Sequence, residues 1–91
     1  MKKTMPLTRQ EQLDALHSAC RLLDQGNPAR AVLELLDAIQ DTPTESDCYP
    51  VMIGTVNWID TLNQPVTALR QLACALLKLD RPGAERTLTN L

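Results

Sequence analysis

The residues of this 91-residue chain that could do chemistry are few and lie far apart. Its single histidine, His17, lies three residues before Cys20, and at that spacing one side of a helix could hold half of a metal site. No second pair completes such a site, so we expect a surface histidine and two buried helix cysteines. The three cysteines, Cys20, Cys48 and Cys74, are odd in number and form no Cys-x-x-Cys pair, which argues against a disulfide framework and against zinc.

Two close pairs of carboxylates are the other candidates for chemistry. They are Glu34 with Asp37 and Glu45 with Asp47. Paired carboxylates can act as general acid and base, but on an exposed helix face and a polar linker they are expected to be solvated charges. The sequence has no glycine-rich phosphate loop, no His-Glu-x-x-His motif and no useful Ser-His-Asp spacing. We therefore expect no enzyme, no cofactor and no metal site.

The composition is typical of an all-α protein, because Leu and Ala dominate and the chain has one Trp, one Tyr, no Phe and three Gly. At this length it predicts a single helical domain over residues 1–91. Nine basic and eleven acidic residues give a net charge of -2 without a run of either sign, which argues against nucleic-acid binding.

The apolar segments are broken by charges well before the roughly 20 residues that span a bilayer. Arg9 and Glu11 also follow the basic start, Met1-Lys2-Lys3, too soon for a signal peptide. We expect a cytoplasmic protein that makes no membrane contact.

A first helical hairpin is predicted over residues 8–42, after a frayed lead at residues 1–7. Thr8 and Glu11 have the spacing of a capping box, and the helix that they start is expected to run to about Gln25. Gly26 suits the turn that follows, because glycine adopts left-handed dihedral angles at little cost. The second helix then begins at Pro28, which is well suited to a first turn, and a polar linker follows at residues 41–50.

A second hairpin is predicted over residues 46–80, with a terminal helix at residues 81–91. Residues 51–62 are rich in β-branched side chains and contain Gly54, yet their apolar positions also fall at helical spacing. We favour a helix there, since no partner strand lies nearby. The next helix opens with Asn63-Gln64-Pro65, and the terminal helix follows Asp80 with Leu88 and Leu91 as apolar contacts.

An internal repeat supports this organisation. Gly26, Ala31, Ala38 and Pro43 have the types and spacing of the second helix of a tetratricopeptide repeat, in which small side chains seven residues apart let a neighbouring helix approach closely. The pattern recurs 37 residues later, pairing Pro28 with Pro65, Ala31 with Ala68, Leu35 with Leu72, Ala38 with Ala75 and Ile39 with Leu76.

The chain therefore resembles the tetratricopeptide family over residues 12–80. The resemblance implies an all-α fold of two antiparallel helical hairpins and a short C-terminal helix in a right-handed stack, with a role in holding partners. An ordinary four-helix bundle is the alternative.

The C-terminal segment carries a second resemblance. An Ala/Leu-rich helix with Cys74 is followed by a glycine-containing turn at residues 80–83 and a Leu-x-x-Leu ending at Leu88 and Leu91. This arrangement is similar to the small tetratricopeptide-like chaperones of type III secretion systems, the YscG/PscG type that holds a needle subunit. The resemblance implies a cytoplasmic chaperone that keeps a self-assembling helical subunit monomeric, together with a second small helical co-chaperone.

An apolar stripe on the first helix is the candidate partner-binding site. Its members recur at the spacing of residues that face the groove of a tetratricopeptide repeat, and they are Leu13, Leu16, Cys20 and Leu23. Two interpretations stay open: the stripe is a groove for the amphipathic helix of a partner, or it is internal core.

The main functional hypothesis is a small chaperone or adaptor that binds another protein, with homo-oligomerisation possible. A compact helical homodimer that acts as a transcriptional or phage-type regulator is the alternative, and a purely structural homodimer is a third.

Overall fold

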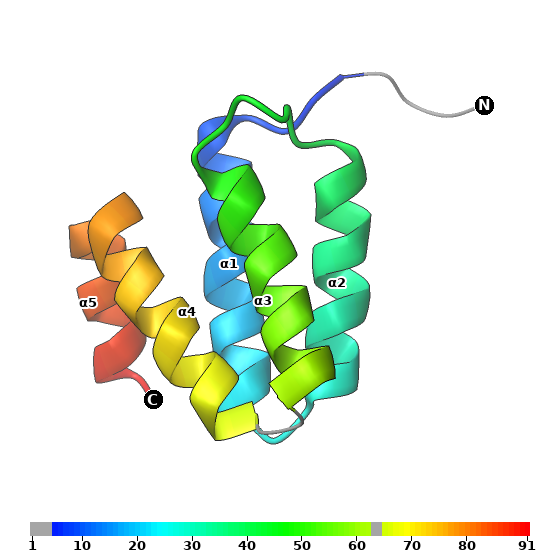
Figure 1. Ribbon diagram of the computed structural model, residues 1–91. Helices are drawn as coiled ribbons and strands as arrows, with labels where there is room; N and C mark the ends of the chain where they lie inside the picture. The colour runs from blue at the N-terminus through cyan, green and yellow to red at the C-terminus, as the bar shows by residue number, and fades with distance from the viewer. Residues whose placement is uncertain (1–4, 63–64) are drawn as a thin grey trace.

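Helices follow one another along the chain with short connections (Figure 1). The structure, a computed structural model, describes residues 5–62 and 65–91. Within these ranges there is no strand, and the helices are α1 (Arg9–Asp24), α2 (Pro28–Gln40), α3 (Cys48–Leu62), α4 (Pro65–Leu79) and α5 (Arg81–Thr89). The expected turn at Asn63 and Gln64 and the first four residues of the expected lead lie outside the described residues. The all-α class, the two hairpins and the short terminal helix are confirmed.

The first four helices form a closed ring. α1 packs extensively on both α2 and α4, α3 packs on the same two helices, and α1 and α3 touch only lightly across the centre. α5 lies outside the ring against α4 and the edge of α1 (Figure 1). A repeat stack would place the first helices of its two units, α1 and α3, together on one surface. The extensive contact between α1 and α4 instead gives the pairing of a four-helix bundle with one helix added.

The predicted start and end of α1 are confirmed. Thr8 and Glu11 form a capping box, in which the backbone N–H of Glu11 donates to Oγ1 of Thr8 at 3.1 Å and the N–H of Thr8 donates to Oε1 of Glu11 at 2.8 Å. Gly26 has a φ of 76°, the left-handed conformation that the turn requires. The end of the predicted lead, residues 1–7, is not frayed as expected. The backbone N–H of Leu7 donates to the carbonyl of Asp41 at 2.7 Å.

The repeat corresponds to equivalent positions in α2 and α4. Each helix begins with its proline, Pro28 or Pro65. The side chains that follow at matching places point into the centre of the ring, and Ala31, Leu35, Ala68 and Leu72 are all 0% exposed. Small and large side chains thus alternate on the inner faces of α2 and α4. This alternation lets both helices pack closely between α1 and α3.

The ambiguous segment is a helix, and it begins earlier than expected. α3 starts at Cys48, inside the predicted linker, because Oγ of Ser46 accepts the backbone N–H of Cys48 at 3.1 Å and thereby caps the helix. Pro50 fits the first turn, where its missing N–H has no partner to lose. The ring of Trp58 lies over Gly54, where an added Cβ would sit 3.3 Å from Cζ2 of the indole.

α5 is docked mainly by polar contacts. Its buried residues are Gly83, Ala84 and Thr87, so only Ala84 contributes a buried apolar side chain. The expected apolar contacts are weaker than predicted, because Leu88 is half-buried and Leu91 is 41% exposed.

No helix among the described residues has the length and hydropathy needed to cross a membrane.

Candidate binding surfaces

The apolar stripe of α1 lies in the core of the ring. Leu16 and Cys20 are 0% exposed, Leu23 is 4% exposed and Leu13 is 7% exposed. α4 packs on α1, and the stripe belongs to one core cluster together with the fully buried Leu72 and Leu76 of α4. Of the two interpretations left open by the sequence, the structure shows internal core; it does not present these four residues as an open groove.

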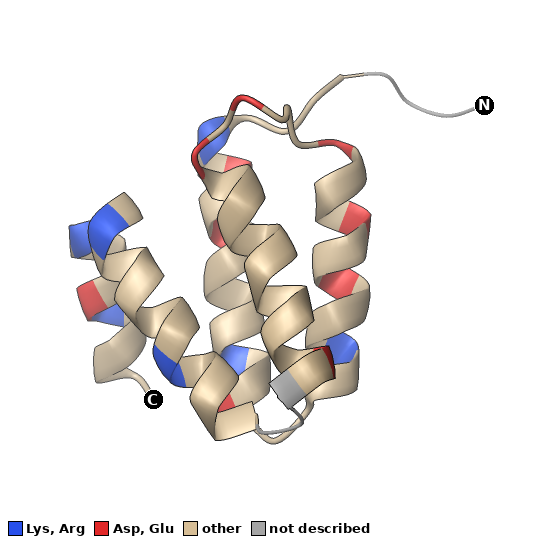
Figure 2. Ribbon diagram, in the orientation of Figure 1, with Lys and Arg blue, Asp and Glu red and all other residues tan. Residues whose placement is uncertain are grey.

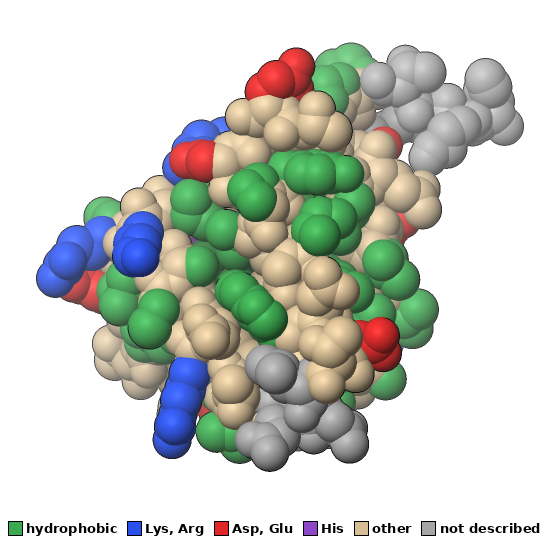
Figure 3. Space-filling view, viewed as in Figure 1, with side chains coloured by type: hydrophobic (Ala, Val, Ile, Leu, Met, Phe, Trp, Pro, Cys, Tyr) green, Lys and Arg blue, Asp and Glu red, His purple; other side chains and the backbone are tan. Residues whose placement is uncertain are grey.

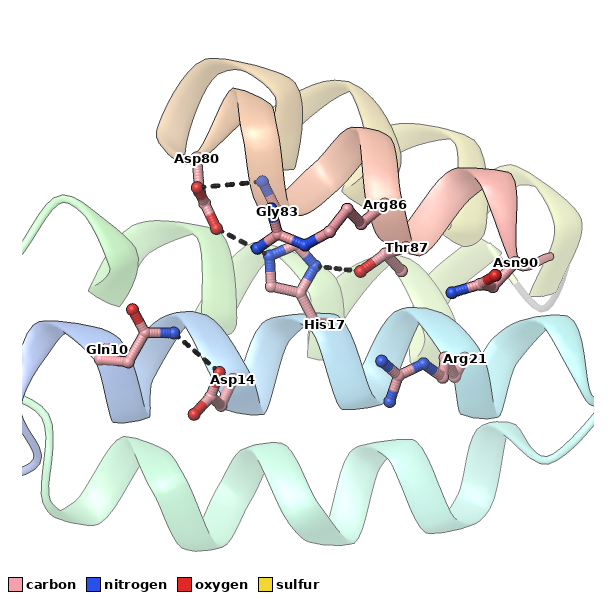
Figure 4. Close-up of a pocket in the computed structure, with 9 residues that line it drawn as sticks. All are labelled: Gln10, Asp14, His17, Arg21, Asp80, Gly83, Arg86, Thr87 and Asn90. Atoms are coloured by element: carbon pink, nitrogen blue, oxygen red, sulfur yellow. Dashed lines mark hydrogen bonds and ion pairs between the residues drawn. The ribbon is translucent and has the colours of Figure 1, made fainter.

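His17 is buried between α1 and α5 and uses both of its ring nitrogens (Figure 4). Nε2 donates to Oδ2 of Asp80 at 3.2 Å, since a carboxylate can only accept. Nδ1 lies 2.8 Å from the hydroxyl of Thr87. The other oxygen of Asp80 accepts the backbone N–H of Gly83 at 3.2 Å and so caps α5. The prediction of a surface histidine is therefore wrong: His17 joins the terminal helix to the bundle.

This network has the residue types of a catalytic triad, but its hydroxyl is buried. The hydroxyl belongs to Thr87, which is only 4% exposed, and the contact joins α5 to α1. Among the described residues, no group of three or more His, Cys, Asp or Glu side chains could hold a metal ion. Because both nitrogens of His17 are engaged, the pair of His17 and Cys20 is not half of a metal site.

A polar cavity of about 230 Å³ lies beside this network, between α1 and α5 (Figure 4). Arg21 and Arg86 line it from the two helices, together with Asn90. Gln10 and Asp14 line its other end, where the amide of Gln10 donates to the carboxylate of Asp14 at 2.9 Å. Cations and carboxylates thus share one small cavity.

Two of the cysteines are inert core residues. Burial raises the pKa of the Cys20 thiol to about 11, and burial also raises the pKa of Cys48. Cys74 is exposed on α4, so the two buried cysteines in helices are Cys20 and Cys48. A raised pKa keeps a thiol protonated and therefore unreactive.

The outer surface of α2 presents apolar side chains that sequence analysis missed. Leu33 is 64% exposed and Leu36 is 45% exposed, one helical turn apart. Beside them a groove of about 480 Å³ runs between α2 and α3, lined mainly by Pro28, Val32, Leu33, Ile59 and Pro65. Figure 3 shows apolar side chains gathered over this part of the molecule.

The other flank of α2 is acidic. A groove of about 440 Å³ between α1 and α2 is lined by three apolar residues, Leu7, Ala15 and Ala38, and by five acidic ones, Glu11, Asp14, Glu34, Asp37 and Asp41. Glu34 accepts from Arg30 at 3.2 Å and from the hydroxyl of Ser18 at 3.0 Å. α2 is therefore a ridge with an apolar groove on one side and an acidic groove on the other.

Comparisons with known proteins do not assign the chain to a family. No protein-family model matches the chain, and neither the curated proteins nor the solved structures give a match.

Proposed function

We propose that this protein is a small protein-binding module, a chaperone or adaptor that holds an amphipathic helix of a partner along the outer surface of α2. The observation that carries the proposal is the exposure of Leu33 and Leu36 on this ridge between two grooves. Exposed leucines that adjoin an apolar groove form the kind of surface that proteins use to bind one another.

The chemistry of the two grooves defines the partner. The groove between α2 and α3 suits apolar side chains, whereas the acidic lining of the groove between α1 and α2, in which Asp37 is exposed, suits Lys and Arg. A partner helix that lies along α2 would satisfy both grooves if it carries an apolar stripe with a basic stripe beside it. The partner is therefore a cationic amphipathic helix.

The resemblance of the C-terminal segment to type III secretion chaperones is the reason to include a self-assembling secretion subunit among the partners, with a second small co-chaperone and a cytoplasmic location. Such a subunit would be kept monomeric if its assembly helix is the one that α2 binds. A transcriptional or phage-type regulator is less favoured, because the chain as a whole is acidic.

Two synthetic helical peptides with the same leucine stripe test the proposal, one with lysines on its polar face and the other with glutamates. The lysine peptide is expected to bind by calorimetry and the glutamate peptide is not. Leu33→Glu should weaken binding of the lysine peptide at least about tenfold, because it places a carboxylate in the apolar contact.

Leu91→Glu is the control, since Leu91 is also an exposed leucine (41% exposed) and follows α5, a helix that packs on α4 and α1 and lines neither groove beside α2. Equal binding of the two peptides, no binding of either, or equal weakening by both substitutions would refute the proposal. Co-purification from the native host with mass spectrometry then identifies the partner.

A further inference from the structure

We propose that the polar cavity between α1 and α5 binds the phosphate group of a small molecule, at a site separate from the ridge of α2. The cavity has a volume of about 230 Å³ and one arginine on each wall, Arg21 from α1 and Arg86 from α5 (Figure 4). Asn90, just after α5, also lines it. Guanidinium and amide groups are donors that proteins commonly use to hold phosphate oxygens.

The arginines of this cavity differ from others of the chain in having no carboxylate partner. Three arginines outside the cavity form ion pairs, Arg9 with Asp47, Arg30 with Glu34 and Arg81 with Glu85. The side chains of Arg21 and Arg86 form no ion pair and no hydrogen bond with any described residue. Two unpaired guanidinium groups therefore line one small cavity.

The nearest acceptors in the cavity are already occupied. Asp80 uses both carboxylate oxygens, one for the N–H of Gly83 and the other for Nε2 of His17, each at 3.2 Å. The hydrogen bond from His17 is the main cause that lowers the pKa of Asp80, and Arg86 makes the smallest contribution. Asp80 is thus a partner of His17 rather than of Arg86. A ligand that binds here must bring its own acceptors and negative charge.

The remaining carboxylate of the cavity marks the end that an anion should avoid. Asp14 accepts from the amide of Gln10 at 2.9 Å. It precedes Arg21 by seven residues, which is about 10 Å along a helix. The anion is therefore expected beside His17, on the side of Arg21 and Asn90.

The arrangement of the donors favours phosphate over carboxylate. Arg21 and Arg86 belong to opposite walls, and Asn90 provides a third group. A carboxylate presents two oxygens in one plane, whereas a phosphate presents oxygens in several directions and can accept from both walls at once. Its charge at neutral pH, about -1.5 to -2, also matches two guanidinium groups.

The distribution of charge should guide an anion to this side of the molecule. From residue 65 to the end, the chain has two acidic residues, Asp80 and Glu85, against four basic ones, Arg70, Lys78, Arg81 and Arg86. In Figure 2, basic residues predominate on α4 and α5 and acidic residues predominate on α2. An anion is therefore attracted toward α5 and repelled from the ridge of α2.

A nuclear magnetic resonance titration tests the site, with inorganic phosphate and glycerol phosphate as probes and acetate at the same ionic strength as the comparison. Both phosphate probes should give saturable shift changes at Arg21, Arg86 and Asn90. The tighter probe identifies the source of the phosphate as the free ion or an ester. Changes that do not saturate, or that acetate reproduces at equal concentration, would overturn the proposal.

Substitutions distinguish a built site from general attraction of anions. Arg21→Gln and Arg86→Gln should each weaken phosphate binding at least about tenfold, because each removes charge-assisted hydrogen bonds. Arg70→Gln is the matched control, since Arg70 is also exposed and unpaired among the described residues but lies on α4, outside the cavity. Equal weakening by all three substitutions would overturn the proposal.

Leu33→Glu separates this site from the proposed function, because it should lose the lysine peptide and keep phosphate binding. Circular dichroism checks that every variant stays folded. Phosphate binding in a native protein that binds neither peptide would refute the proposed function alone, and peptide binding without phosphate binding would refute the phosphate site alone.

Discussion

Nε2 of His17 in α1 donates to Oδ2 of Asp80 at 3.2 Å, across 63 residues of the chain. Together with the contact between His17 and Thr87, this hydrogen bond fixes the terminal helix to the ring. α5 buries one apolar side chain, Ala84, so its docking depends on this polar network more than on hydrophobic burial. Changes to the network should therefore loosen α5 before they affect the ring.

Gly83→Ala should destabilise the docking of α5. A Cβ at this position would overlap the carboxylate of Asp80 and lie 3.1 Å from Nε2 of His17. Asp80 can move away only by giving up its bonds to His17 and to the N–H of Gly83, and the loss is expected to be about 1–2 kcal/mol. In an ordinary helix position the same substitution stabilises.

Chemical denaturation measures this change, with Glu85→Ala on the exposed side of α5 as the control, expected within about 0.5 kcal/mol. A stabilised Gly83→Ala variant would show that the close approach of α5 to His17 is wrong.

Acid should weaken the same contact. The hydrogen bond from His17 holds the pKa of Asp80 below its ordinary value, and the N–H of Gly83 adds to this effect. A carboxyl group whose pKa is lowered by folding contributes stability above its unfolded pKa, near about 4, and this contribution disappears as the pH falls through the lower folded pKa. Thermal unfolding between neutral and acid pH should show Asp80→Asn losing less stability in acid than the native protein does. Parallel curves for the two proteins would contradict the role of Asp80.

One thiol of the three should react with an aromatic disulfide reagent at neutral pH. Cys74 is exposed, whereas burial raises the pKa of both Cys20 and Cys48 and removes them from solvent. Denaturant should release the other two. Rapid reaction of a second thiol in the native protein would mean that the core opens easily near α1 or α3.

Close packing of α2 should make its small residues hard to enlarge. Ala31 is 0% exposed, so Ala31→Leu is expected to cost about 1–3 kcal/mol through overpacking. Ala29→Leu, an exposed position in the same helix, should change the free energy of unfolding by no more than about 0.5 kcal/mol. Equal denaturation midpoints for the two variants would contradict the inward orientation of Ala31.

Local signals in the sequence predicted most of the fold. The capping box at Thr8, the left-handed Gly26 and the prolines that begin α2 and α4 act over a few residues, and each is present as expected. The second hairpin was predicted from residue 46, but the helix within it was predicted only from Val51, because the cap of α3 comes from Ser46, a residue inside what reads as a polar linker.

Long-range pairing could not be predicted in the same way. Periodicity shows that Leu16 lies on an apolar stripe, but whether α4 or a partner covers that stripe depends on how the two hairpins meet. His17 and Asp80 come together only because α5 folds back onto α1. Leu33 and Leu36 could have been found, since they fall outside the helix face that carries Ala31, Leu35 and Ala38.

The location of the partner surface is the central claim, and a two-dimensional nuclear magnetic resonance titration with the lysine peptide tests it most directly. The account predicts that the largest shift changes fall on the ridge of α2, at Leu33, Leu36 and Asp37, while the amides of Leu13, Leu16, Cys20 and Leu23 change little because their side chains stay in the core. The largest changes at those four α1 residues would contradict it, because the core of the ring would then open to receive the helix.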